Sequence, residues 1–393
     1  MAGSVGEPTA FLAEALSDPD RTRGWDMFTT FVPGINPVAV EGLHPTARLA
    51  GLFPHPGSGR ERRRTRGEVL PVTYAGFIRA IRSGQGIDTL VLHVAPPDSD
   101  GNCSLGPMVE FFPELLKQDR RILAVVNDRI PAFDGTLSVP ASRIEAYCES
   151  DDPLREYAAG DIDPVSLNIA ERSASFIEDG TTLQVGIGKA PVALLGQLGG
   201  RRGLRLHSGL ATEGVVSLLE QGILAPDCPS LSTALLGTSG FYDWLRTNPP
   251  LKVRGCDVTH DPVRLAQLPR FVAINSALEV DLHGQANLER AGSRLVSATG
   301  GSLDFAHAAS LAPGGCSIVI LAATGPGGRS RIVPRLGEAA LVTLPRTCID
   351  VVITEHGIAD LRGLCGKGRA EAIAAVADPA ARADLAIHLD QFD

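Results

Sequence analysis

Short runs of apolar residues recur along the chain, and each run is bounded by polar or glycine-rich segments. Runs of this length and composition are typical of strands buried in a sheet. We predict strands at Asp88–Val94, Arg121–Val126, Thr182–Val185, Leu204–His207, Phe271–Asn275, Ser317–Ala322, Ala340–Leu344 and Ile349–Thr354.

Stretches with helical periodicity lie between these runs. The clearest is Pro164–Glu178, in which Leu167, Ala170, Ala174 and Ile177 form one apolar stripe. Asp163 is the expected N-cap, with proline at the first helical position. Strands that alternate with helices indicate an α/β fold with mainly parallel sheets.

The chain is long enough for two domains, since it has 393 residues. A polar, turn-rich segment, ESDDPLREYAAGDIDP, covers residues 149–164 and precedes a new strand–turn–helix unit. We therefore predict one domain at residues 1–165 and a second at residues 166–393.

Composition and charge exclude several classes of protein. The hydrophobic fraction of 44% is that of a globular protein, and the net charge of −9 argues against general nucleic-acid binding. The apolar runs are too short to cross a membrane, and the first residues lack the pattern of a signal peptide. The seven cysteines form no CxxC pair, which favours a reducing compartment and predicts no metal site. We therefore expect a cytoplasmic protein. A loop at residues 54–67 carries five arginines, which are either a solvated surface or an attraction for a polyanion.

Two glycine segments could bring the backbone close to a ligand. Gly186, Ile187 and Gly188 lie between a predicted strand and a predicted helix, where free N–H groups favour an anion. The segment SATGGSLDF contains Gly300 and Gly301. A tight strand-to-helix turn explains the first segment equally well, and a hairpin or bulge explains the second.

Polar groups follow two other strands. Glu279 and Asp281 share one face of a predicted strand in FVAINSALEVDLHGQAN. Thr354, Glu355 and His356 end the last apolar run, where α/β folds place ligand sites. Taken alone, an exposed carboxylate and a structural histidine are the simpler interpretations.

Together these segments resemble the acetyl-CoA hydrolase/transferase family, the class I CoA-transferases that include 4-hydroxybutyrate and butyrate:acetate CoA-transferases. The similarity runs through most of the chain in order. It includes PPDSDGNCSLG, AVVNDRIP, DGTTLQVGIGKAP, INSALEVDLHGQAN, TGGSLDF, SRIV and TEHGIADLRG.

The resemblance implies two similar CoA-transferase-type α/β domains. It implies transfer of coenzyme A between short-chain carboxylic acids through a glutamate nucleophile, with backbone N–H groups that stabilise the oxyanion. The substrates would be an acyl-CoA thioester and a short-chain carboxylate. Coenzyme A would enter as a substrate, no cofactor or metal would stay bound, and the protein would form a homodimer or a larger homo-oligomer. Gly186, Ile187, Gly188, Gly300 and Gly301 would contact coenzyme A or the acyl group.

The sequence departs from the family at the nucleophile. A His-Ser-Glu or His-Thr-Glu run follows the GIG turn in the family, whereas this chain has His207-Ser208-Gly209. Glycine cannot attack a thioester. Three explanations stay open. Another carboxylate attacks, with Glu279 preferred to Glu213. Alternatively, water attacks with His207 or Glu279 as the base, which makes a hydrolase. In the third explanation the chain binds acyl-CoA without turnover.

The N-terminal region departs as well. The family has a helix and a strand before the segment matched by GEPTAFLAEAL, which begins here at Gly6. Either the start site of this sequence was chosen late or the first strand is missing, and in the second case we expect an altered edge in the sheet of the first domain.

Overall fold

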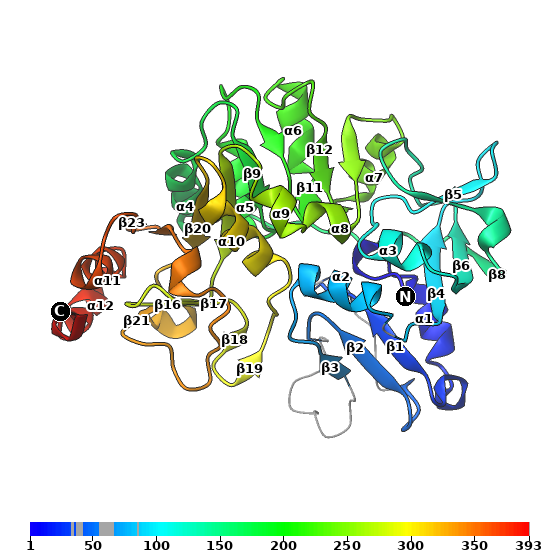
Figure 1. Ribbon diagram of the computed structural model, residues 1–393, viewed down its shortest axis with the longest axis horizontal. Helices are drawn as coiled ribbons and strands as arrows, with labels where there is room; N and C mark the ends of the chain where they lie inside the picture. The colour runs from blue at the N-terminus through cyan, green and yellow to red at the C-terminus, as the bar shows by residue number, and fades with distance from the viewer. Residues whose placement is uncertain (33–34, 37–41, 55–66, 85, 393) are drawn as a thin grey trace. The chain divides into compact units, whose positions relative to one another are not determined.

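The computed structural model describes residues 1–32, 35–36, 42–54, 67–84 and 86–392. The chain divides into two compact units (Figure 1). The first contains Met1–Ala158 and Leu231–Thr259, and the second contains Ala159–Ser230 and His260–Asp393. The predicted boundary at residue 165 lies close to Ala158. Residues 231–259 return to the first unit, which no pattern in the sequence predicts. The arginine-rich loop falls almost entirely outside the described residues.

The first unit is built on two three-stranded parallel sheets. One has the order β1-β2-β3, with strands Asp26–Thr29, Arg48–Gly51 and Gly67–Val69. The other has the order β4-β6-β8, with strands Thr89–Val94, Arg121–Asn127 and Ala146–Ser150. The pair β5 (Asn102–Ser104) and β7 (Ser138–Pro140) is antiparallel. The helices of this unit include α1 (Thr9–Ala15), α2 (Tyr74–Arg82), α3 (Phe112–Leu116), α7 (Ser239–Leu245) and α8 (Cys256–Thr259).

The second unit is built on a six-stranded sheet of order β10-β9-β15-β20-β22-β23. All its strands run parallel except β23 at one edge. In that order the strands are Arg205–Leu206, Thr182–Val185, Phe271–Ser276, Cys316–Ile320, Val351–Thr354 and Gly357–Asp360. The four central strands are almost completely buried, as their continuous apolar runs predict.

Helices cover this sheet. Helix α10 (Ser302–Leu311) packs on β15 and β20, and Phe305, Ala308 and Ala309 lie against Phe271 and Ala273. Helix α4 (Pro164–Ala174) packs beside β22 and α5 (Lys189–Gly196). The remaining helices are α6 (Gly214–Glu220), α9 (Pro262–Leu265), α11 (Gly366–Ala375) and α12 (Pro379–Ala386). The α/β fold with mainly parallel sheets is confirmed.

Local signals in the sequence were reliable where short-range chemistry decides the structure. The Asp163 carboxylate accepts a hydrogen bond of 2.8 Å from the Ser166 N–H and caps α4, as predicted. The helix ends at Ala174 and not at Glu178.

One predicted strand is wrong, because residues 340–344 form no regular strand. The N–H groups of Thr343 and Leu344 both donate to the Ala286 carbonyl, so this segment makes only an isolated bridge. Leu341 and Val342 stay exposed.

Candidate functional site

The segments predicted to carry the chemistry follow neighbouring strands of the six-stranded sheet. Gly186 comes directly after β9, His207 follows β10, and Ala277 follows β15. Parallel strands place their carboxyl ends at one edge of a sheet, where open α/β folds bind ligands. The segments that follow β9, β10 and β15 therefore lie at the same edge of the sheet.

The turn between β9 and α5 contains the first glycine segment. Gly188 is the N-cap residue of α5 and has φ +119°, a conformation that requires glycine. At Gly186, an added Cβ would meet only the Ile274 carbonyl oxygen, at 3.9 Å. Gly188 is thus needed for the shape of the turn, whereas Gly186 leaves open space beside the backbone.

The segment after β10 is buried. His207 donates its N–H to the Leu183 carbonyl at 2.9 Å, and the Ser208 hydroxyl donates to the Val185 carbonyl at 2.8 Å. These bonds hold the segment against β9. Gly209 follows, and an ideal Cβ there would stand 3.0 Å from His260 Nε2 and 3.4 Å from Phe305 Cε2.

The second glycine segment lies at the start of α10. Gly300 has φ +51°, and Gly301 is the N-cap residue of the helix. The Thr299 hydroxyl donates to Glu289 at 3.2 Å, which anchors the approach to these glycines. A Cβ on Gly301 would stand 2.4 Å from His260 Nε2. The His260 ring therefore lies next to both Gly209 and Gly301. No motif in the sequence singled out this histidine.

Glu279 begins strand β16 (Glu279–Asp281), which pairs with β17 (Ala286–Asn287) and β21 (Ile332–Val333). Its side chain is half-buried and accepts a hydrogen bond of 3.1 Å from Asn287 Nδ2. Asn287 is fully buried, and its Oδ1 accepts the N–H groups of Glu289 and Arg290. The amide is therefore held in place and orients the Glu279 carboxylate, a positioning role that the sequence analysis did not assign.

Asp281 has a different role from its neighbour. Its fully buried carboxylate accepts the backbone N–H groups of His283, Gln285 and Leu336, and also the Gln285 side-chain amide. Four donors saturate this carboxylate inside a turn. Asp281 is thus structural, and Glu279 is the carboxylate that can meet a ligand.

Two buried polar side chains lie on the sheet face that α10 covers. Asn275 shares this face with Phe271 and Ala273, and Gln184 pairs with Ala273 across the sheet. Asn275 Nδ2 and Gln184 Oε1 have no hydrogen-bond partner among the described residues. A buried donor or acceptor without a partner is costly, which makes these two atoms candidates to contact a ligand or water. The sequence signal was a polar residue inside each apolar run, in FVAIN and TLQV.

Charge in this cluster is suppressed by burial. The pKa of His260 is lowered to about 3, first by its burial and then by the proximity of His207. Its imidazole is therefore neutral at physiological pH. A neutral imidazole has one N–H donor and one lone pair.

The other candidate residues make contacts of their own. Glu213 is exposed at the start of α6. Glu355 accepts the Ala323 N–H at 2.8 Å, and so it holds the loop after β20. His356 Nε2 lies 3.6 Å from Asp378 Oδ2, in an ion-pair position at the surface. These contacts support the structural interpretation of His356.

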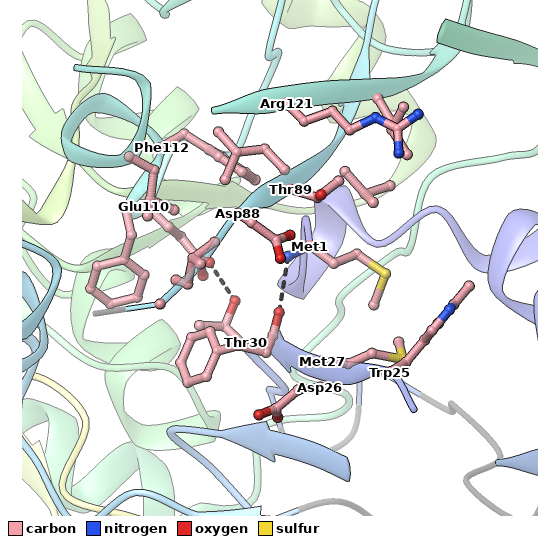
Figure 2. A pocket seen from close by; sticks show the side chains of 18 of the residues that line it. Met1, Trp25, Asp26, Met27, Thr30, Asp88, Thr89, Glu110, Phe112 and Arg121 are labelled. Carbon is pink, nitrogen blue, oxygen red and sulfur yellow. Dashed lines mark hydrogen bonds between the residues drawn. The ribbon is translucent and has the colours of Figure 1, made fainter. Parts of the chain in front are cut away.

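A cavity of about 480 Å³ lies in the first unit, and none of the candidate site residues predicted from the sequence lines it. It is lined by β1 and β4, the facing edges of the two sheets, and Figure 2 shows it from close by. The Thr30 hydroxyl donates to the buried Glu110 carboxyl there. Burial raises the pKa of Glu110 to about 7, against the effect of this hydrogen bond. The cavity has a mixed lining, in which Asp26, Asp88 and Arg121 lie among apolar side chains, and it shares no residue with the second-unit site.

In the part of the chain that the structure describes, no group of three or more His, Cys, Asp or Glu side chains could hold a metal ion. Among the same residues, no helix combines the length and apolar character needed to span a membrane.

Comparisons with known proteins agree with the fold and with the resemblance seen in the sequence. Residues 237–389 match the acetyl-CoA hydrolase/transferase C-terminal domain. The chain is 30% identical to the 4-hydroxybutyrate coenzyme A transferase of Clostridium kluyveri, over 98% of this chain and 92% of that protein. It is 28% identical to the acetyl-CoA hydrolase of Eremothecium gossypii, over 82% of this chain and 69% of that protein.

A solved structure shows the same architecture. RipA from Yersinia pestis superposes with a TM-score of 0.84 at 25% identity, over 98% of this chain and 99% of RipA. The fold and the ordered sequence segments define a CoA-transferase-type α/β protein. The chain belongs to the acetyl-CoA hydrolase/transferase family.

Proposed function

We propose that this protein transfers coenzyme A between short-chain carboxylic acids, with Glu279 as the attacking carboxylate. The observation that carries the proposal is the Glu279 carboxylate itself, which is half-buried and oriented by the fixed amide of Asn287. Similarity to the 4-hydroxybutyrate CoA-transferase over nearly the whole chain supports the reaction class.

The proposed reaction begins when a Glu279 oxygen attacks the thioester carbonyl carbon. The C–S bond breaks, coenzyme A leaves as its thiolate, and a mixed anhydride forms. The thiolate then attacks the glutamyl carbonyl and releases the first acid, which leaves a glutamyl-CoA thioester. The second carboxylate reverses these steps and leaves as the new acyl-CoA.

The tetrahedral intermediates place negative charge on the former carbonyl oxygen. Donors aimed at that charge give a large part of catalysis in acyl transfer. We propose that Asn275 Nδ2, together with backbone N–H groups of Gly186–Gly188 and Gly300–Gly301, forms this oxyanion site. The buried Nδ2 of Asn275, which has no hydrogen-bond partner in the described part of the chain, supports its inclusion.

Hydrolysis is the second candidate function, and Gly209 favours it. A chain without a side chain at the family's nucleophile position could direct water at the thioester, with His207 or Glu279 as the base. Similarity to the acetyl-CoA hydrolase of Eremothecium gossypii is compatible with this reaction. Binding without turnover is the outcome expected if neither carboxylate nor water attacks.

The test is a comparison of two carboxylate variants. Glu279→Gln keeps the shape of the side chain and a hydrogen-bond acceptor for Asn287, and it should lower CoA transfer by roughly 10³-fold or more, as loss of a nucleophile does in other enzymes. Glu213→Gln, at the exposed start of α6, is the matched control and should retain full activity. Transfer from butyryl-CoA to acetate, free thiol release and acyl-CoA affinity are measured side by side. Retained transfer in Glu279→Gln would contradict the assignment.

We further propose a homo-oligomer in the cytoplasm. All seven cysteines are free thiols, which a reducing compartment favours. Light scattering on the purified protein would give the oligomeric state.

A further inference from the structure

Gly209 is not needed by its own backbone. Its φ lies outside the left-handed region that favours glycine, so the main chain there would accept any residue. The same holds for Gly301, whose φ of −92° and ψ of −1° are helical. Any obstacle to a side chain at these two positions must therefore come from neighbouring atoms and not from the backbone conformation.

The obstacle comes from one side chain. A Cβ on Gly209 would stand 3.0 Å from His260 Nε2 and 3.2 Å from His260 Cε1. A Cβ on Gly301 would stand 2.4 Å from both Cδ2 and Nε2 of the same ring. Real Cβ atoms essentially never show a distance as short as the 2.4 Å at Gly301, and at Gly209 the ring would have to move by a few tenths of an ångström to accept a Cβ. The His260 ring thus lies between the two glycines and fills the space in front of each.

The ring has little freedom to move aside. His260 is 1% exposed, and its ring packs on Phe305 with a centroid distance of 4.6 Å. Phe305 packs in turn on Phe271 of β15, at 6.4 Å between ring centroids. The next residue, Asp261, caps α9 by accepting the Val263 N–H at 2.9 Å, which fixes the backbone on that side.

We propose that His260 determines the reaction specificity of this chain by occupying the space that a side chain at position 209 would need. Gly209, His260 and Gly301 form an interlocked unit, and no attacking carboxylate can stand at position 209 while the ring is in place. Attack on the thioester must then come from Glu279 or from water. The steric part stands on the structure alone, whereas the consequence for specificity rests on the proposed acyl-CoA chemistry.

The steric part is tested by a thermodynamic cycle on folding. Gly209→Ala should lower the unfolding temperature by several degrees when His260 is present. In a His260→Ala background, the same change should cost nothing or should stabilise the protein, because the added methyl group then fills space. Gly186→Ala is the matched control, since its Cβ would meet only a carbonyl oxygen at 3.9 Å, and its effect should be the same in both backgrounds. Equal destabilisation by Gly209→Ala in both backgrounds would overturn the interlock.

The specificity part is tested by restoring a carboxylate. Gly209→Glu alone should form no covalent intermediate at residue 209, because the ring blocks the carboxylate. The double variant Gly209→Glu, His260→Ala should do so on incubation with butyryl-CoA. An oxygen of the introduced carboxylate attacks the thioester, the C–S bond breaks, and the released thiolate then displaces butyrate to leave a glutamyl-CoA thioester.

Intact-mass analysis with peptide mapping detects this adduct. An adduct at residue 209 in the single variant would contradict the block. A folded double variant with no adduct at residue 209 would contradict the specificity role. The folding cycle does not depend on activity, so failure of the proposed function leaves its result interpretable.

Discussion

Acid should weaken the first unit through His93. This histidine lies on β4, is 5% exposed, and is fixed on both ring nitrogens. Nδ1 lies 3.3 Å from the Gly6 carbonyl oxygen and must donate, whereas Nε2 lies 3.1 Å from Asn127 Nδ2 and must accept. Asn127 cannot flip at low cost, because its Nδ2 also donates to the Asp152 carbonyl and its Oδ1 accepts the Arg129 N–H. Protonation would set an Nε2–H group against an amide N–H.

The size of this loss of stability follows from the lowered pKa of His93. Burial lowers the pKa of His93 from 6.5 to about 4, partly offset by the Gly6 carbonyl and by Asp152. A depressed histidine pKa means that its contribution to stability is complete above pH 6.5 and is lost as the pH falls towards 4. Linkage gives a loss of about 2 kcal/mol at pH 5 and about 3 kcal/mol at the acid limit.

The assay can be confined to this unit. Both tryptophans of the chain, Trp25 and Trp244, belong to the first unit, so their fluorescence follows its unfolding. Urea unfolding at pH 7.5 and at pH 5 measures how much unfolding free energy the wild type loses between these pH values. The variant His93→Gln cannot titrate in this range, and the difference between the two pH values removes any constant cost of the substitution.

The variant should lose about 2 kcal/mol less than the wild type between these pH values. An equal loss in both proteins would show that His93 does not titrate with the lowered pKa, and the tautomer argument would then be wrong.

Two further predictions concern other buried carboxyl groups. Burial raises the pKa of Glu7 to about 7, against the effects of Arg155, Asn36 and Thr9. The contribution of Glu7 to stability is therefore complete below pH 4.5 and is lost as the pH rises through 7. Glu7→Gln should then stabilise the first unit by up to about 3 kcal/mol at pH 8.5 and by little at pH 5. Urea unfolding at the two pH values measures this difference. Asp281→Ala should lower the stability of the second unit by about 3 kcal/mol or more, because it leaves several buried donors unpaired. Glu279→Ala should lower that stability much less, and a thermal melt followed by circular dichroism compares the two variants. Equal losses of stability would refute the different roles of the two carboxylates.

The sequence predicted the central sheet well, because strands buried on both faces have continuous runs of apolar residues. The runs at Thr182–Val185 and Phe271–Asn275 became β9 and β15 almost without change. The N-cap of α4 was equally clear, since Asp163 acts within three residues of itself. The strand predicted at residues 340–344 was wrong, because this segment only makes hydrogen bonds to Ala286 and does not join a sheet.

The site was predicted only in part. The glycine segments and Glu279 could be proposed because they occur in ordered segments that resemble a known family, and the strands gather several of these segments at one edge of the sheet. His260 could not be found, because its role depends on contacts with Gly209 and Gly301, each about 40 to 50 residues away in the sequence. The return of residues 231–259 to the first unit is equally non-local. Neighbour patterns in a sequence carry no record of such contacts.

The most direct test of the central claim is mass spectrometry of the intact wild-type protein after incubation with butyryl-CoA, followed by borohydride reduction and peptide mapping. We predict a covalent CoA thioester in the intact protein, which reduction then marks on the peptide that contains Glu279. Accumulation of free coenzyme A with no adduct on any carboxylate would contradict this account and would identify water as the attacking group.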